Sequence, residues 1–392
     1  MERSEQNRFP LFKNRLVVFS GVEHHIMGTD YIAHGGFVRE IDIWARIFEQ
    51  VMVVTRLGLG PVLSDEVPYA EPNVSVVCLP APASTDGIYG KIKMLFYLPV
   101  WLFRSLNLLS INDVVMARGP ESIGFLGWLV TRFKKLPRFA KYVNQWDDYK
   151  NEPIGYRLQK KVYRDGNFGG PVMIYGAMDE RRPHLVPFFP VGISQLEWER
   201  AGIQIKQRVP PPPFRLLFVG RFVYIKGIDI LLDAFNFLNG KRNDLILDIV
   251  GDGPLRSSIE ARIAHYGLSN VHLHGWLPPN KISQFYIQAH ILIHSSRIEG
   301  FGKVLVEAMN YGLPIVGADL GVSRELVEKN HCGVLFQNGD ALHLAAQINH
   351  ILSSRLSMQE FGDAGRLISS DLVLERLDER YRQFVRDRVL LP

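Results

Sequence analysis

The sequence has little cysteine, no long apolar run and no apolar leader. Its 392 residues contain two cysteines, Cys78 and Cys332, which lie far apart and show neither metal-ligand nor redox spacing. We interpret both as reduced thiols in a reducing compartment. The longest apolar run, from Met94 to Phe103, is interrupted by Pro99 and is shorter than the roughly 18 residues that span a bilayer. Residues 1–15 are polar and charged, which argues against a signal peptide.

The absence of a spanning segment predicts a cytoplasmic protein, and it leaves open peripheral contact with the inner face of a membrane. Nine Lys/Arg but only two acidic residues lie between Lys91 and Lys141. This stretch is either a solvated face or a basic, apolar patch for anionic lipid or an anionic substrate. The segment Tyr89–Leu108, with Lys91, Lys93, Tyr97, Trp101, Phe103 and Arg104, suits a lipid interface or a helix packed on a sheet. We expect no nucleic-acid partner.

The length of the chain and its apolar pattern predict two α/β domains. The composition, 47% hydrophobic and 22% charged, is that of a globular protein. Both halves alternate short apolar strands with amphipathic helices, as in a parallel sheet covered by helices. The expected strands are Leu16–Ser20, Val51–Val54, Val74–Cys78 and Val114–Ala117 in the first half, and Leu216–Gly220, Leu245–Val250, Val271–His274, Ile291–His294 and Ile315–Ala318 in the second.

Four consecutive prolines, 210–213, precede the first strand of the second half. They cannot lie inside a helix or sheet, so we interpret them as an extended connector rather than a docking ligand. We expect a first domain at 1–200, a second at 201–370 and a terminal helix at 371–392. Leu374, Leu377, Tyr381 and Phe384 lie on one side of that helix.

The segment 295–309 combines glycines and carboxylates between a strand and a helix. Gly300 and Gly302 allow a ligand to approach the backbone closely, and the following helix begins with unpaired N–H groups that suit a phosphate. Glu299 and Glu307 flank this anion site. The helical rise separates them by roughly 12 Å, about the distance from the sugar to the ribose of a nucleotide diphosphate sugar. Solvation of a helix is the alternative for both glutamates, but it leaves the glycines unexplained.

A second segment, 219–227, ends the first strand of the second half. Gly220 precedes Arg221, which can bind phosphate oxygens bidentately, and Lys226 supplies a compact positive charge. Ligands of doubly wound sheets bind at this edge, where the two cations would stabilise a departing diphosphate. Ordinary surface salt bridges are the alternative.

Weaker signals follow other strands. Gly251 belongs to a Gly-Asp-Gly-Pro turn after the next strand, and Trp276 would cover a nucleobase or simply pack. Gly35 and Gly36 would bring a helix N-terminus of the first half to the phosphates, or form a plain turn.

These segments together resemble the retaining GT-B glycosyltransferases of family 4 (glycosyl transferases group 1). The family pattern is G-R-x-x-x-x-K-G, then G-x-G-P, then E-G-F-G-x-x-x-x-E-A-M. It matches here at Gly220, Arg221, Lys226 and Gly227, at Gly251, Gly253 and Pro254, and from Glu299 to Met309. The resemblance is strong over about 213–352 and lies mostly in layout over the first half.

The resemblance implies two Rossmann-like domains facing across a cleft, with the terminal helix crossing back to the first. A nucleotide diphosphate sugar would bind the second domain, and a saccharide or lipid-linked acceptor the first. Glu299 would contact the sugar, Glu307 the ribose, and Arg221 and Lys226 the diphosphate. Gly300, Phe301, Gly302 and Val304 would complete the donor site. It also implies hexosyl transfer with retention of configuration and no metal or permanently bound cofactor, in polysaccharide biosynthesis.

The sequence departs from the family near the sugar. Relatives frequently carry histidines where this chain has Arg118 and the run 144–148, so we assign Arg118 and Asp147 to the acceptor side. The expected Gly-Gly-x-x-Glu turn here has Val322 in place of its second glycine. Two alternatives stay open: a non-catalytic nucleotide-sugar-binding partner subunit, and an epimerase of the same architecture.

Overall fold

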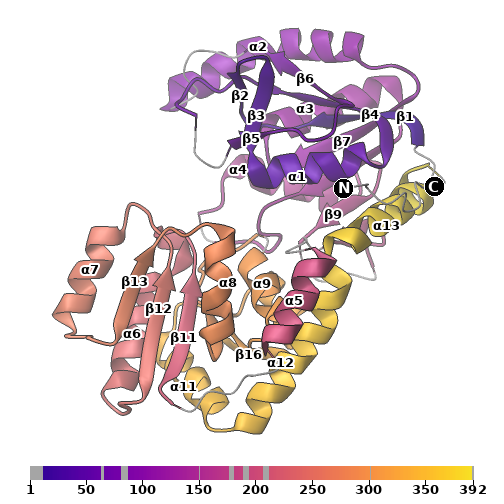
Figure 1. Ribbon diagram of the computed structural model, residues 1–392. Coiled ribbons are helices and arrows are strands. Elements are labelled where there is room, and N and C mark those ends of the chain that lie inside the picture. The colour runs from indigo at the N-terminus through magenta and orange to yellow at the C-terminus, as the bar shows by residue number, and fades with distance from the viewer. Residues whose placement is uncertain are drawn as a thin grey trace.

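Two α/β units lie one above the other in the computed structural model (Figure 1). The structure describes residues 12–62, 66–80, 87–149, 151–175, 181–188, 194–205, 212–300 and 302–390, without the side chains of 87–95, 279 and 280. Each unit is built around a parallel sheet, of seven strands in the first and six in the second. No helix formed by the described residues is long and apolar enough to cross a membrane.

The first sheet has the strand order β10-β9-β8-β7-β1-β4-β6. Its strands, in chain order, are β1 (Phe12–Phe19), β4 (Phe48–Arg56), β6 (Val74–Leu79), β7 (Asp113–Gly119), β8 (Arg138–Tyr142), β9 (Val172–Ile174) and β10 (Leu185–Pro187). Alternate residues face opposite cores: Leu16 and Val18 join one cluster and Val17 and Phe19 the other. Burial on both faces explains why the sequence reads as continuous apolar runs.

Helices cover both faces of the first sheet. They are α1 (Gly35–Ala45), α2 (Gly87–Leu108), α3 (Ser122–Lys134) and α4 (Ile154–Arg164). A small antiparallel sheet, which the sequence did not predict, is formed by β2 (His24–Met27), β3 (Asp30–His34) and β5 (Glu66–Pro68). Because β3 leads directly into α1, this sheet sets where that helix begins.

The second sheet has the order β13-β12-β11-β14-β15-β16. Its strands are β11 (Phe214–Val219), β12 (Leu245–Val250), β13 (Val271–Gly275), β14 (Ile291–His294), β15 (Ile315–Ala318) and β16 (Gly333–Phe336). The accompanying helical segments are η1 (Tyr224–Lys226), α6 (Ile228–Asn239), α7 (Arg256–His265), α8 (Pro279–Gln288), α9 (Lys303–Asn310), α10 (Gly321–Ser323), η2 (Arg324–Glu328) and α11 (Ala341–Leu352). All nine predicted strands are present, to within a few residues at their ends; β8, β9, β10 and β16 were not predicted.

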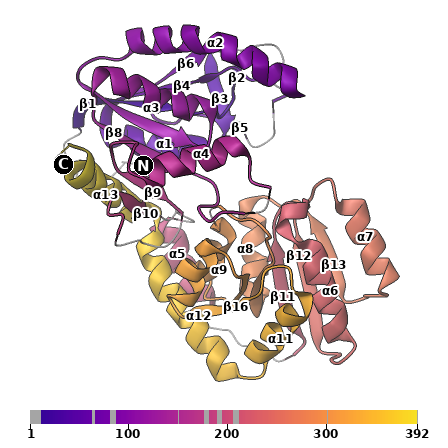
Figure 2. The same cartoon turned by 180° about the vertical axis from the view of Figure 1, so that it is seen from behind.

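The chain returns to the first unit at its C-terminus. Helix α12 (Arg355–Ser369) packs on α9, and η3 (Ser370–Leu372) leads into α13 (Leu374–Phe384) and η4 (Val385–Leu390). Figure 2 shows α13 lying against the first unit. Tyr381 is buried there and stacks on Trp44 with ring centroids 3.9 Å apart. The predicted crossing of the terminal helix is therefore confirmed.

The predicted division between residues 200 and 201 falls inside helix α5 (Gln195–Ile205). This helix packs with the second unit: Trp198 donates from Nε1 to Oγ of Ser369 over 3.0 Å, and Arg366 lies 4.0 Å above its ring. We therefore place the boundary before α5. Of the proline connector, Pro210 and Pro211 lie outside the described residues, and Pro212 and Pro213 directly precede β11.

Candidate active site

Three loops at the carboxyl ends of β11, β12 and β14 meet in the second domain, and glycines make the meeting possible. Gly251 has φ 143°, and a Cβ there would lie 1.9 Å from the carbonyl oxygen of Gly220. Gly227 has φ 62°, and its Cβ would lie 2.1 Å from the oxygen of Ser295. A larger residue at either position requires the backbones to separate. The glycines of two predicted motifs thus hold the loops together.

Glu299 is the centre of a hydrogen-bonded cluster between these loops. Its Oε2 accepts from Nζ of Lys226 at 2.5 Å, from Nε2 of His294 at 3.0 Å and from Oγ of Ser296 at 3.2 Å. The carboxylate side chain is only 12% exposed. The structure therefore brings two of the predicted catalytic residues, Glu299 and Lys226, into direct contact.

Sequence reasoning missed His294 as a site residue. It is the last residue of β14, and the carboxyl end of a parallel strand is where ligands bind, which was the available signal. Its side chain is almost fully buried and points to the carboxylate of Glu299.

The environment of Glu299 favours its ionised form. Burial alone would raise the pKa of this carboxyl, but the hydrogen bond from His294 and the charge of Lys226 outweigh burial and hold the pKa far below the usual value of 4.5. Glu299 is therefore an anion at neutral pH, able to accept hydrogen bonds from hydroxyl groups.

This lowered pKa makes stability depend on pH. A group whose folded pKa is depressed contributes stability above its unfolded pKa, and that contribution is lost as the pH falls from about 4.5 toward the folded pKa. We expect the difference in unfolding free energy between wild type and Glu299→Gln to shrink between neutral pH and about pH 3. Urea titrations of both proteins across this range measure it; a difference independent of pH would contradict the assigned pairing.

Helix α9 begins next to Glu299. Gly302, at φ 65°, precedes its first residue, Lys303, and no side chain among the described residues caps the helix. The first N–H groups of a helix have no partner within it, so those of Lys303 and Val304 suit a phosphate oxygen. Gly302 N also lies 3.5 Å from Oε1 of Glu299. Phe301, predicted here as a donor contact, lies outside the described residues.

Glu307 lies on the same helix, farther from the loops. Its carboxylate accepts a 2.7 Å hydrogen bond from the hydroxyl of Tyr286 and lies 3.2 Å from Nζ of Lys303. Tyr286 is buried and stacks on Tyr311, with ring planes 4° apart. Glu307 is thereby held in one orientation by a rigid aromatic pair that the sequence did not indicate.

Two other predicted donor residues are exposed. The guanidinium of Arg221 has no hydrogen bond or ion pair with another residue in the described part of the chain. Trp276, directly after β13, is 67% exposed. Trp276 is therefore exposed rather than packed. Of the two cations for which salt bridges were the alternative, Lys226 pairs with Glu299, and Arg221 forms no ion pair within the described residues.

On the first domain, Gly35 and Gly36 begin α1, and the side chain of His34 accepts from Gly36 N at 3.2 Å. Arg118 lies at the carboxyl end of β7, with its guanidinium carbon 5.0 Å from the centre of the Phe37 ring. Asp147 lies 3.5 Å from Arg324 of the second domain.

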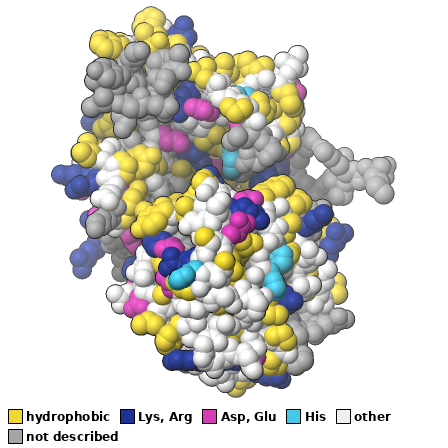
Figure 3. Space-filling model, turned by 90° about the vertical axis from the view of Figure 1, so that its left-hand side faces the viewer, with side chains coloured by type: hydrophobic (Ala, Val, Ile, Leu, Met, Phe, Trp, Pro, Cys, Tyr) yellow, Lys and Arg dark blue, Asp and Glu magenta, His cyan; other side chains and the backbone are white. Residues whose placement is uncertain are grey.

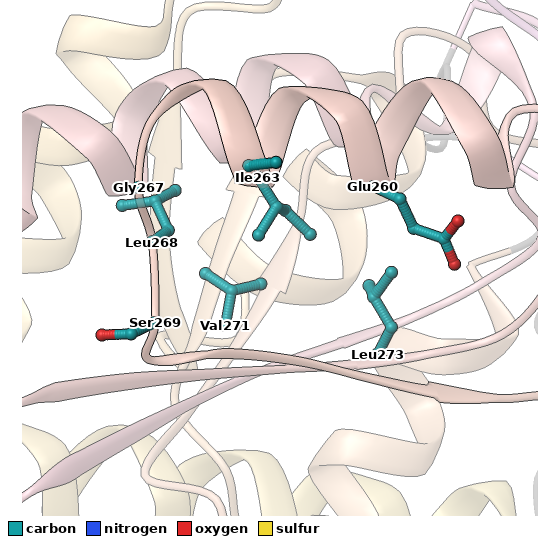
Figure 4. Close-up of a pocket in the computed structure, with 8 residues that line it drawn as sticks. Glu260, Ile263, Gly267, Leu268, Ser269, Val271 and Leu273 are labelled. Carbon is teal, nitrogen blue, oxygen red and sulfur yellow. The ribbon is translucent and has the colours of Figure 1, made fainter.

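The described residues contain no group of three His, Cys, Asp or Glu side chains placed to hold a metal ion. A cavity of about 390 Å³ lies between α7 and β13, lined by Glu260, Ile263, Val271 and Leu273 among others (Figure 4). None of the predicted site residues lines it, so it is separate from the cluster around Glu299.

Figure 3 shows the face of the molecule on the side of α7. Basic and acidic side chains lie close together there on both domains.

Residues 200–367 match the family described as glycosyl transferases group 1. An uncharacterized glycosyltransferase of Methanocaldococcus jannaschii is 31% identical over 160 residues, which cover 41% of this chain and 44% of the relative. The amylovoran biosynthesis glycosyltransferase AmsD of Erwinia amylovora is 31% identical over 158 residues, 40% of this chain and 44% of the relative. The O-antigen chain mannosyltransferase C of Escherichia coli is 29% identical over 153 residues, which cover 38% of this chain and 40% of the relative. The chain thus spans less than half the length of these relatives.

Solved structures resemble the chain over nearly its whole length. The sucrose-phosphate synthase of Thermosynechococcus elongatus superposes with a TM-score of 0.67 at 21% identity, covering 96% of this chain and 99% of that one. HepE of Anabaena, solved in complex with UDP, superposes with a TM-score of 0.66 at 17% identity, covering 96% of this chain and 100% of that one. At these identities the likeness concerns the fold alone. The chain therefore has the GT-B fold of two Rossmann-like domains, and its residues 200–367 are similar to the glycosyl transferases of group 1.

Proposed function

We propose that the protein transfers a sugar from a nucleotide diphosphate sugar to a saccharide or lipid-linked acceptor, with retention of configuration and without a metal ion. The observation that carries the proposal is the cluster of Glu299, Lys226 and His294 beside the uncapped start of α9. It places a fixed anion, a cation and helix N–H groups around one point, as a sugar diphosphate requires.

In this proposal the α9 N-terminus, with Gly300, Phe301, Gly302 and Val304, binds the diphosphate. Lys226 and Arg221 stabilise the negative charge that develops on the leaving diphosphate, the role a metal ion has elsewhere. His294 and Ser296 also hydrogen-bond the carboxylate of Glu299. They keep it in place when the ammonium group of Lys226 turns toward the phosphate.

The remaining donor contacts follow from the same placement. Glu299 binds sugar hydroxyls and Glu307 binds the ribose. Trp276 covers the base, and Gly220 and Gly251, where two loops meet, contact the donor through their backbones. HepE was solved with UDP, and with UDP and glucose, so uridine is the first base to test.

Gly35 and Gly36, at the start of α1, contact the donor phosphates from the first domain. The acceptor is assigned to the first domain, with Arg118 and Asp147 on its side. The curated relatives include enzymes named for amylovoran biosynthesis and for the O-antigen chain, so we propose a glycan or lipid-linked saccharide as acceptor and a cytoplasmic role in polysaccharide biosynthesis.

Nucleotide release from UDP-, GDP- and ADP-sugars, with chelator and a panel of saccharide and lipid-linked acceptors, tests this function. We expect acceptor-dependent release, and a product whose anomeric configuration by NMR equals that of the donor. Epimerised sugar formed without acceptor would instead indicate the epimerase, and binding without turnover under every acceptor the partner subunit.

Contact with an anionic membrane is proposed for the α2 face. Phe96 and Phe103 of α2 are 76% and 67% exposed, and Arg104 is exposed beside them. Trp101, predicted at the lipid interface, is instead fully buried and donates from Nε1 to the oxygen of Pro80, because it faces the sheet. The side chains of Lys91 and Lys93 lie outside the described residues.

We expect the protein to co-sediment with vesicles containing phosphatidylserine at low salt and to be released at high salt, because screening weakens the attraction between basic side chains and anionic lipid. Phe96→Ser with Phe103→Ser should reduce the bound fraction several-fold, roughly the loss expected for removing two apolar anchors. Absence of co-sedimentation at low salt would contradict this contact.

A further inference from the structure

Residues 144–148, which we call the bridging loop, follow β8 and contact the second domain at Glu299. Gln145 of this loop is 5% exposed, and its Oε1 accepts a 3.0 Å hydrogen bond from the backbone N–H of Glu299. The two residues lie in different domains and 154 positions apart in the sequence. The first domain thus bonds to the backbone of the residue at the centre of the candidate donor site.

Two more contacts lie beside this bond. A Cβ on Gly300 would lie 3.0 Å from the Cα of Asn144, so the backbones of the two domains touch there. The carboxylate of Asp147 faces Gly321, where a Cβ would lie 2.5 Å from Oδ2, and it also lies 3.5 Å from Arg324. The contact therefore extends on both sides of Gln145.

A buried lysine fixes the bridging loop from within the first domain. Nζ of Lys160 on α4 is completely buried; it lies 2.6 Å from Oε1 of Glu152 and donates to the carbonyl oxygens of Trp146 and Asp147 at 3.3 and 3.1 Å. It also lies 3.0 Å from Oδ1 of Asp148. One charged group thus holds four oxygens, which keeps Gln145 in place for its bond to the second domain.

We propose that Gln145 is a positioning residue for Glu299: its hydrogen bond fixes the backbone of Glu299, so that the carboxylate meets the sugar of the donor only when the bridging loop is docked. This inference rests on the proposed function. Gln145 touches no reacting atom in this account and acts through the orientation of Glu299. Free nucleotide diphosphate, which lacks the sugar, does not depend on it.

The test compares the binding of UDP with UDP-glucose, GDP with GDP-mannose, and ADP with ADP-glucose by calorimetry without metal. In wild type, the matching sugar conjugate should bind more tightly than its free diphosphate. Gln145→Met keeps the size of the side chain but removes the acceptor oxygen. We expect it to lower the affinity for the sugar conjugate about tenfold, the effect of losing one hydrogen bond, and to leave the affinity for the free diphosphate unchanged.

Two further variants separate positioning from folding. Gln145→Asn keeps the amide group but shortens the side chain by one methylene, so its oxygen no longer reaches the N–H of Glu299, and it should lower the preference for the conjugate as Gln145→Met does. Gln359→Met makes the same chemical change at an exposed position of α12 and should behave as wild type.

The outcomes distinguish this inference from the proposed function. If no nucleotide or conjugate binds wild type, both fall. If wild type prefers the conjugate and Gln145→Met keeps that preference, or if wild type binds diphosphate and conjugate equally, the positioning role alone is overturned. Equal loss of both ligands in Gln145→Met and in Gln145→Asn also overturns it.

Discussion

Replacing Glu299 by alanine is expected to lower turnover by a factor on the order of 10² or more, and Lys226→Ala by a similar factor. In the proposed reaction both groups face the point where charge develops as the diphosphate leaves, and Glu299 is mostly buried there. Because the two side chains are in contact at 2.5 Å, the double variant should lose less than the product of the two single losses.

Initial rates of nucleotide release by the purified variants measure this prediction. Glu260→Ala serves as the control, because Glu260 is an exposed glutamate on α7 of the same domain. Circular dichroism confirms that each variant is folded. Wild-type rates in folded Glu299→Ala or Lys226→Ala would remove these residues from the reaction.

Lys160→Met is expected to lower the free energy of unfolding by about 3–5 kcal/mol, the largest stability effect among the variants described above. The ammonium of Lys160 is completely buried and its partner Glu152 has a side chain only 1% exposed. Removing one partner leaves the other as an uncompensated buried charge, which is far more costly than losing the pair.

The double variant Lys160→Met with Glu152→Leu is the matched control. It removes both charges at similar volume and should recover most of the lost stability. Urea unfolding of the three proteins measures the effect. A loss below about 1 kcal/mol in Lys160→Met, the range of an exposed salt bridge, would show that this pair is hydrated in solution.

Much of the fold could be predicted from the sequence because buried strands and helices show characteristic patterns of apolar residues. Both faces of each sheet are covered, so the strands appear as continuous apolar runs, and Ile228, Leu231, Leu232 and Phe235 of α6 are all buried as their spacing predicts. The terminal helix was predictable for the same reason.

The meeting of the loops that carry the proposed donor-site residues was also predictable, since the loops follow strands and gather at one sheet edge. The placement of Gly251 against Gly220 is such a case. These positions remain assigned by proposal to a donor, with Phe301 outside the described residues.

Contacts between segments that are distant in the sequence produce no such pattern and could not be predicted. The bond from Glu299 to Gln145 joins two domains, and neither local pattern nor spacing indicates it. The short strands β2, β3 and β5 carry polar residues such as His24 and Glu66 and lack a long apolar run. Trp101 has the composition of an interface residue, but its burial is decided by which side of α2 faces the sheet.

The central claim is that residues around Glu299, Lys226 and Glu307 bind a nucleotide diphosphate sugar. Thermal unfolding of the purified protein with UDP, GDP, ADP and their sugar conjugates, without metal, tests it most directly, because a ligand of the folded state must stabilise it by about 2.7 kcal/mol at a hundred times its Kd. We predict a clear rise in Tm for one nucleotide series, lost in Glu307→Ala. No rise with any of them would contradict the donor site, and the catalytic roles assigned to Glu299 and Lys226 with it.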